Sequence, residues 1–344
     1  MDAGGEMSGS TPTVLLFYDG FEHRARPGPV GYVASQTHRF ARFSYRTLRR
    51  RQTRTGFYTW FVMLCRALKH AGVRVRINDF AAAAAAPNTP IGAAGYPSVL
   101  TALDRLTNPR LVGPGLYGNP LENPDLFKDP RNVLYLQTCD WNGDMFKPWF
   151  GDRQRPWFGG FDVADFPALD RAARTNDVLI YDKIYFDRDE LYPRLIGAFV
   201  ASLEARGLTY KIIRYGHYHY SDYLDAVRAS RCMAFFAHSE TQGMAYQECL
   251  ASNTPIFAWD EGVWPSPVAK ELGLGPIACT SVPYFDQRCG MRFKASTMLE
   301  AWTHFYPALD QFEPRRFIAE DMTLQKSAEL YLKAYRETAM AAQR

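Results

Sequence analysis

The sequence has few cysteines, and they follow no spacing that suits a metal site or a redox pair. Its six cysteines include no C-x-x-C pair, and its seven histidines form no H-E-x-x-H or His-x3-His pattern. Three of the cysteines lie inside apolar segments, as buried free thiols do. His217 and His219 are two residues apart, but acidic residues near them are sparse. A zinc site is therefore not expected.

Long apolar runs and a leader segment are also missing. The opening residues, MDAGGEMSGSTPT, lack the charged start and apolar core of a signal peptide. No window approaches the length of a membrane span. We therefore expect a cytoplasmic protein with reduced thiols, and peripheral contact at the inner face of a membrane stays open. A net charge of +4 is too small by itself to indicate a nucleic-acid-binding protein.

Acidic residues are absent from one long segment near the N-terminus. None occurs from His23 to Asn78, whereas arginines gather at Arg39, Arg42, Arg46, Arg49, Arg50, Arg51 and Arg54. A charge run of this kind is usually a solvated, flexible surface. Alternatively, the region from Arg39 to Arg54 contacts an anionic membrane or holds an anionic acceptor. Nucleic acid is not expected as a partner, because the sequence contains no recognised nucleic-acid motif.

The first half of the chain shows strand and helix patterns in alternation. Apolar runs at 13–18, 110–115 and 132–138 predict strands, and the alternating segment 73–79 predicts another. Before that segment, a stretch long enough for a helix follows Gly56 and ends at Gly72. We expect 19–55 to be a long loop or a helical insertion, and the alanine-rich stretch 80–87 to be a loop or a short helix.

The second half repeats the alternation more regularly. Strands are predicted at 177–183, 210–216, 232–238 and 254–260, and helices at 188–207, 220–230, 243–252 and 322–343. Alternation at this spacing indicates a parallel, doubly wound sheet. Together with a length of 344 residues, it predicts two α/β domains. Ligands in such sheets bind at the carboxyl ends of the strands, where Lys183, Gly216 and Glu240 fall.

Two glutamates stand eight residues apart across a predicted loop-to-helix junction. Glu240 and Glu248 form an E-x7-E pattern with Gly243 in the turn, followed by CLASNTPIFAWD. Further segments are WFGGFDVADF at 157–166, SVPYFDQRCG at 281–290, and FEPRRF before the long terminal helix. On these residues the chain resembles a GT-B glycosyltransferase, closest to the retaining enzymes that carry an E-x7-E motif. The likeness covers nearly the whole second half, and the first half matches in outline.

The resemblance implies a fold and an activity. The expected fold is α/β, with two Rossmann-like, doubly wound domains facing a cleft. Residues 1–160 would form the acceptor-side domain and 161–318 the nucleotide-sugar-binding domain, with a C-terminal helix in 319–344 packing back on the first. The expected reaction moves a hexosyl group from a nucleotide-diphosphate sugar to a glycan, lipid or small-molecule acceptor, with retention of configuration.

The resemblance also assigns roles to the residues around the two glutamates. Glu240 would contact the donor-sugar hydroxyls near the reacting carbon, and Glu248 would hold the ribose, because a carboxylate can accept from both hydroxyls of a diol. Thr241, Gln242 and Gly243 would offer backbone N–H groups at a helix N-terminus. The competing interpretations are a helix cap or surface loop residue for Glu240 and an exposed residue favoured by the helix dipole for Glu248.

Further residues complete the expected site. Lys183 would stabilise the leaving diphosphate, but the arginine that the family usually carries nearby is missing, and Arg188 or Arg214 could replace it. Gly216 and Tyr218 would line the base pocket, although Tyr218 is equally well explained as ordinary packing and Lys183 could be a surface residue. Gly56 would belong to the acceptor side.

No D-x-D motif stands in a suitable setting, so neither a metal ion nor another cofactor is expected, and lysine or arginine with a helix dipole would take the place of the cation.

Two alternatives to a glycosyltransferase remain. One is a related enzyme of the same fold, such as a nucleotide-sugar epimerase or a phosphorylase, although no segment matches the lysine site of the phosphorylases. The other is a non-catalytic protein that binds nucleotide sugars or docks on a membrane.

Overall fold

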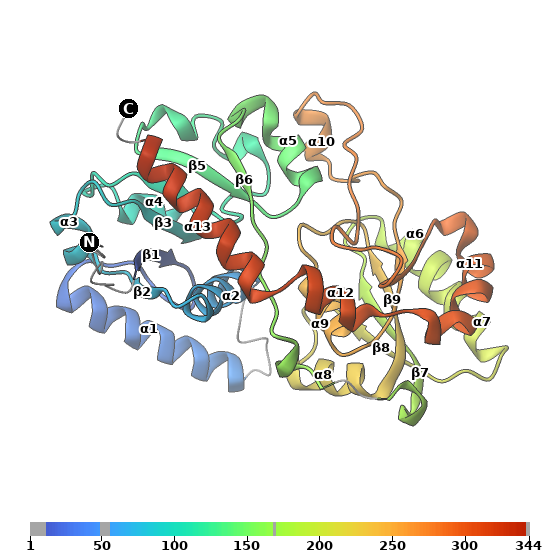
Figure 1. The fold of residues 1–344 in the computed structure, drawn as a ribbon. Coiled ribbons are helices and arrows are strands. Elements are labelled where there is room, and N and C mark those ends of the chain that lie inside the picture. Colours follow the sequence, from blue (N-terminus) through green and yellow to red (C-terminus); the bar gives the residue numbers. More distant parts are fainter. Residues whose placement is uncertain (1–11, 49–55, 168–169, 342–344) are drawn as a thin grey trace, which may run out of the picture.

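The structure is a computed structural model that describes residues 12–48, 56–167 and 170–341. Two parallel sheets, each with helices on both faces, lie side by side in Figure 1. The strand order is β2-β1-β3-β4-β5-β6 in the first sheet and, read from its opposite edge, β8-β7-β9-β10-β11 in the second. In each sheet the second strand lies on one side of the first strand and the third strand lies on the other side. The direction in which strands are added therefore reverses between β1 and β3 and between β7 and β9, as in doubly wound folds.

The N-terminal sheet is buried on both faces, as a parallel sheet with helical crossovers must be. Its strands are β1 (Thr13–Asp19), β2 (Arg74–Ile77), β3 (Ile91–Gly95), β4 (Arg110–Val112), β5 (Asn132–Gln137) and β6 (Gln154–Pro156). Its helices are α1 (Gly28–Leu48), α2 (Gly56–His70), α3 (Phe80–Ala85), α4 (Ser98–Ala102) and α5 (Asp140–Phe150). Alternate side chains of β1 enter different cores: Phe17 packs with α3, α4 and α5, and Leu16 packs with α2.

The C-terminal sheet follows the same plan. Its strands are β7 (Asn176–Lys183), β8 (Tyr210–Arg214), β9 (Ser230–Ala237), β10 (Ile256–Trp259) and β11 (Gly290–Phe293). The following helices are α6 (Arg188–Tyr192), α7 (Ala198–Glu204), α8 (Tyr220–Ala229), α9 (Met244–Ala251), α10 (Val268–Glu271), α11 (Met298–Phe305), α12 (Pro314–Asp321) and α13 (Leu324–Ala341). Tyr181 of β7 faces α8 and α9, and Ile180 faces α7 and α11.

The last helix returns to the first domain, as the fold class predicts. The red helix α13 crosses the N-terminal domain in Figure 1 and packs on α2, β4 and β5. Tyr331 and Tyr335 of α13 enter the core of the first domain. There the Tyr335 hydroxyl accepts from the backbone N–H of Leu15 at 3.3 Å. The chain thus passes between the sheets twice, after β6 and before α13. The exact boundaries at 160 and 318 stay predictions.

The predicted elements are present, with two kinds of difference. The helix predicted over 188–207 is wrong as a single helix, because a π-helical turn (Pro193–Gly197) divides it into α6 and α7. Pro193 has no N–H to donate and its ring crowds the preceding turn, so the regular ladder is interrupted there. Elements that the sequence did not predict are the strands β3, β6 and β11 and the helices α4, α5, α10, α11 and α12. The segment 19–55 contains a helix, α1, and the alanine-rich stretch contains α3.

The strand β3 was missed because it is built from small residues. It reads IGAAG and is buried throughout. A Cβ on Gly92 would lie 2.0 Å from the Tyr331 hydroxyl of α13. Since α13 crosses this close to the strand, large β-branched side chains have no room, and the hydrophobic signal of a central strand is lost.

Candidate functional site

The centre of the C-terminal sheet brings Lys183 and Glu240 together. Strands β7 and β9 are direct neighbours, and their register sets Lys183 beside Ala237. Glu240 follows Ala237 by three residues, so its carboxylate reaches the end of β7. The strand order reverses between these two strands, and the crevice beyond such a reversal is the ligand site of doubly wound sheets.

Lys183 and Glu240 form an ion pair in this crevice. The Lys183 ammonium donates to the Glu240 carboxylate, and the two side chains are 15% and 12% exposed. The Lys183 nitrogen also lies 4.5 Å from the centre of the Tyr215 ring, which favours a cation on its face. Each charge is therefore compensated while little water reaches it. Of the three, Tyr215 was not predicted, since its place depends on the turn that follows β8.

The N-terminus of α9 lies directly beyond Glu240. Gly243 has a φ of +80°, and a Cβ there would lie 2.0 Å from the Tyr246 ring. Only glycine fits this turn without strain. The partly exposed Thr241 precedes it. The free N–H groups of the first helical turn suit an anion or a hydroxyl, as the sequence predicts for this segment.

Gln242 joins the two domains with its side chain. Its amide oxygen accepts from Trp60 Nε1 at 2.7 Å and from the backbone N–H of Gly159 at 2.9 Å. Its amide nitrogen donates to the carbonyl of Gly159 at 2.8 Å and to the Gln247 oxygen at 3.0 Å. The side chain is fully buried and engaged with protein, so any donor contact of Gln242 would come from its backbone.

Glu248 lies one turn further along α9, in a second group of residues. Its carboxyl accepts from the Tyr220 hydroxyl at 2.9 Å, and the described residues offer it no cation. Burial raises the pKa of Glu248 to about 8, and the Tyr220 hydrogen bond only partly opposes this rise. A carboxyl held in this way can accept from a diol.

The loop after β8 supplies the other predicted donor residues. The Tyr218 hydroxyl lies 2.8 Å from that of Tyr181, and burial raises the pKa of Tyr218 above its usual range. Gly216 has a φ of +79° with open space where a Cβ would stand. The structure thus places Glu248, Tyr218 and Gly216 around one loop. Tyr220 was missed, although it stands two residues after Tyr218 in the same GHYHY run.

The two candidate arginines differ in their surroundings. Arg188 forms a two-pronged ion pair with the buried Asp182, at 2.7 and 2.5 Å. It therefore anchors the start of α6. Arg214 is exposed at the end of β8, and strand register places it beside Asp182. Arg214 is the more accessible of the two for a diphosphate.

The N-terminal domain closes the crevice from the other side. Trp141 of α5 donates its indole N–H to the Glu240 carbonyl at 2.8 Å, and the Tyr284 hydroxyl donates to the Thr138 carbonyl. Trp141 and Tyr284 line a cavity of about 490 Å³ between the domains. Its other lining residues are Cys139, Asp140, Asp144 and Met145 from one domain and Leu274, Ile277, Ala278, Cys279, Thr280 and Pro283 from the other. Gly56 faces Met244, the first residue of α9, at 3.7 Å from where a Cβ would stand.

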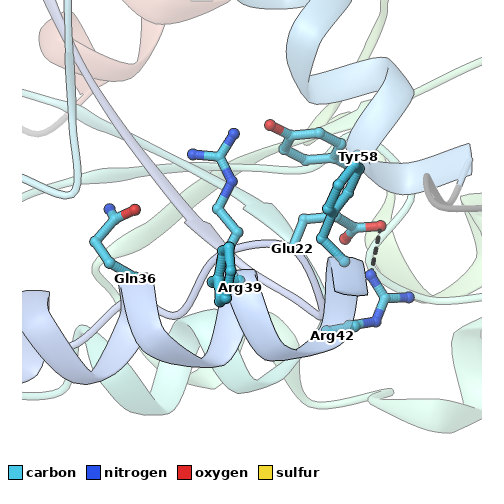
Figure 2. A pocket seen from close by; sticks show the side chains of 7 residues that line it. Glu22, Gln36, Arg39, Arg42 and Tyr58 are labelled. Carbon is cyan, nitrogen blue, oxygen red and sulfur yellow. Dashed lines mark ion pairs between the residues drawn. The ribbon is translucent and has the colours of Figure 1, made fainter. Parts of the chain in front are cut away.

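A second cavity, of about 430 Å³, lies beyond the end of β1. Figure 2 shows Gln36 and Arg39 rising from α1 into it, while Tyr58 reaches it from the first turn of α2. Glu22 is buried in its floor, where Arg42 pairs with it at 3.3 Å. We call this space the acceptor-side pocket. Within the described ranges it combines an exposed cation with aromatic walls.

The described ranges contain neither a metal-binding cluster nor a membrane-spanning helix. No three His, Cys, Asp or Glu side chains there gather as a metal site would require. No helix in the same ranges is both long enough and apolar enough to cross a bilayer. Arg49, Arg50, Arg51 and Arg54 lie outside the described residues. The absence of a metal requirement stays a prediction.

Comparisons with known proteins address the fold. No known protein family and no curated protein matches the sequence. A glycosyltransferase from Rickettsia africae matches with a TM-score of 0.53 and 10% identity, over 95% of this chain and 98% of that chain. Sucrose-phosphate synthase from Thermosynechococcus elongatus matches with a TM-score of 0.55 and 10% identity, over 96% and 100%. The longer TarM matches at a TM-score of 0.47 and 9% identity, and the chain spans 55% of its length. The two full-length matches, with the paired sheets, show the GT-B fold.

Proposed function

We propose that the protein is a retaining glycosyltransferase that moves a hexosyl group from a nucleotide-diphosphate sugar to a glycan, lipid or small-molecule acceptor. The observation that carries this proposal is the Lys183–Glu240 pair at the strand reversal, followed along the chain by the carboxyl of Glu248 on α9, which has a hydrogen bond from Tyr220 and no cation among the described residues. The crevice therefore offers a cation, a helix N-terminus and two carboxyls to one ligand. A nucleotide sugar has an anionic diphosphate between a ribose diol and a polyhydroxyl ring, which matches this set.

The proposed chemistry uses these groups in order. Glu248 accepts from the ribose hydroxyls, with Gly216 and Tyr218 beside the base. The bond between the sugar and the diphosphate breaks as the acceptor hydroxyl bonds to the same face of the sugar carbon and passes its proton to the leaving phosphate. Lys183 and the N–H groups from Thr241 to Gly243 stabilise the negative charge on that phosphate. Arg214, at the end of β8, helps to stabilise this negative charge. Glu240 accepts from the sugar hydroxyls and holds the reacting carbon in place.

The acceptor enters from the N-terminal domain in this proposal. Gly56 leaves room opposite Met244, and the acceptor-side pocket opens within two residues of it, at Tyr58. The reaction is proposed to need no metal and no other cofactor. Peripheral contact with a membrane through Arg39–Arg54 also belongs to this proposal, and the structure describes the first ten residues of that range.

The test is a calorimetric and thermal-shift panel of UDP, GDP, ADP, TDP and CMP. One nucleoside diphosphate should bind wild type and lose most of its affinity in Glu248→Ala. The control is Glu329→Ala, which removes an exposed glutamate of α13 and should bind as wild type does. If none of the five binds to wild type, or if the two variants bind alike, the proposal fails.

A further inference from the structure

Helix α1 exposes apolar side chains where a soluble protein exposes charged ones. At helical spacing, its outer stripe contains no charged residue and consists of Val30, Val33, Thr37, Phe40, Ala41, Ser44 and Leu48. The exposed fraction is 83% for Val30, 73% for Phe40 and 84% for Leu48. Among the positions with less exposure, Gly31, Ser35, Arg42 and Arg46 form the opposite stripe, so Arg42 and Arg46 face the protein. The exposed Arg39 lines the acceptor-side pocket. The helix is amphipathic with its apolar side outward.

The described residues bury little of this helix against the domain. Among the side chains of α1 that the structure describes, Ser35 alone is buried, and its hydroxyl accepts from the backbone N–H of Arg24 at 2.9 Å. Arg42 pairs with Glu22 and covers the Phe21 ring at 5.0 Å. The acceptor-side pocket separates much of the rest from α2 (Figure 2). Figure 1 shows α1 along the outer edge of the molecule, with no other helix or strand of the described residues beyond it.

A helix of this length is not stabilised by such contacts alone. A helix of about 20 residues is marginal in water, and most of its stability in proteins comes from burying an apolar face. Helix α1 contains no acidic residue, so no ion pair forms between its own side chains. A row of large apolar side chains that is left in water marks an interaction surface. The outer stripe therefore needs an apolar surrounding.

The positive charge around α1 indicates which partner covers the outer stripe. The segment from His23 to Asn78 contains thirteen Lys and Arg residues and no acidic residue. Two copies meeting through α1 would bring like charges together, whereas an anionic lipid surface attracts them. A helix with a large apolar stripe, basic residues and low mean hydropathy lies in the plane of a bilayer interface.

We propose that α1 docks the protein on an anionic lipid surface, with Val30, Val33 and Leu48 inserted among the acyl chains. The proposal rests on the exposed apolar stripe and does not depend on the sugar transfer proposed above. It differs from a purely electrostatic contact of the arginine run, because here the apolar stripe makes the contact and the charges strengthen it.

The experiment measures co-sedimentation of the full chain with phosphatidylglycerol and with phosphatidylcholine vesicles. The test variant is Val30→Ser, Val33→Ser and Leu48→Ser combined, which spares the residues lining the acceptor-side pocket. The matched control makes the same kind of change at three exposed apolar positions away from α1: Ile77→Ser, Leu299→Ser and Met340→Ser. Nucleotide binding and circular dichroism check that both triple variants are folded.

We expect wild type and the control to bind phosphatidylglycerol vesicles more tightly than neutral ones. The α1 variant should lose about tenfold or more of that binding, since three apolar side chains no longer leave water. Lack of binding by wild type, or equal binding by the α1 variant, would overturn the proposal. A wild-type dimer that the α1 variant turns into a monomer would overturn it too, and would assign the stripe to a second copy of the chain.

Discussion

The ammonium of Lys183 is paired with the carboxylate of Glu240 where the strand order of the second sheet reverses. The pair has a consequence for ligand binding. An anionic ligand that approaches Lys183 finds its charge already matched by Glu240. Removing the Lys183 charge and removing the Glu240 charge should therefore have opposite effects on the binding of a diphosphate, although both residues are needed for transfer.

We expect Lys183→Met to weaken nucleoside diphosphate binding and Glu240→Gln to strengthen it, because the second change releases the ammonium from its carboxylate. Both variants should lower donor turnover about 100-fold or more. Turnover is measured as nucleoside diphosphate released from the donor sugar, and binding by calorimetry.

The matched control for this prediction is Glu337→Gln. It breaks the Arg155–Glu337 ion pair, whose side chains are partly exposed and lie between α13 and β6. Turnover of the control should stay within about twofold of wild type, as expected of a surface pair. Equal binding changes in Lys183→Met and Glu240→Gln would contradict the coupled role of the pair.

Glu248 should make the stability of the protein depend on pH. Burial raises its pKa in the folded chain to about 8, from 4.5 in an unfolded one. Between these two values the folded state keeps a proton that the unfolded state has released, so the contribution of Glu248 to stability falls as pH rises through this window. Glu248→Gln removes the effect. Because Glu248 is partly exposed to solvent, the effect should be smaller than the full pKa difference gives. The variant should be more stable than wild type by about 2 kcal/mol at pH 8 and equal to it near pH 4.

Urea unfolding of both proteins at several pH values gives this difference directly. Glu329→Gln, at an exposed position of α13, should show no such trend relative to wild type. A difference between wild type and Glu248→Gln that stays constant from pH 4 to pH 8 would show that the carboxyl is already ionised in the folded protein.

Gly243→Ala should disturb the start of α9 more than an ordinary turn substitution does. Both Gly243 and Gly207 have a positive φ, but only at Gly243 would a Cβ meet another group, the Tyr246 ring. We expect Gly207→Ala to cost about 1 kcal/mol of stability and Gly243→Ala about 3 kcal/mol, with loss of nucleotide binding in the second. Equal losses in urea unfolding would mean that the ring moves aside without cost.

Gln242→Leu tests whether this residue joins the domains or touches the donor with its side chain. Leucine leaves the Trp60 indole N–H and the N–H and carbonyl of Gly159 without their partners. We expect a loss of about 3 kcal/mol of stability. Trp60→Phe removes one of these bonds and should cost less in the same unfolding assay. Unchanged stability together with lost nucleotide binding would assign the side chain to the donor instead.

Local sequence predicts the parts of this fold whose apolar pattern is strong. Strands such as β7 and β9 are rich in Val, Ile and Phe, and their helices lie between clear turn residues, so their order follows from the alternation. The E-x7-E pattern placed Glu240 at the end of β9. The pairing with Lys183 then depends only on β7 and β9 being neighbours, which the doubly wound order supplies.

The remaining features depend on contacts between distant segments. The small residues of β3 make sense only under α13, which is more than two hundred residues away. Trp141 and Tyr284 reach the crevice because the two domains close on each other, and no local pattern marks them. The outward apolar stripe of α1 has the same periodicity as a buried one, so the sequence alone does not say which side faces the core.

The return of α13 sets the order in which the protein can be completed during synthesis. A ribosome releases β1 and β3 long before it makes Tyr331 and Tyr335, the side chains that pack against them. Until then, α2 covers one part of the face of the first sheet that carries Leu16 and Gly92, and the part beneath α13 stays open. The second domain, by contrast, is released with nearly all of its own helices. The first domain is thus completed only after the second, and chains that end before α13 would keep part of an apolar sheet face exposed.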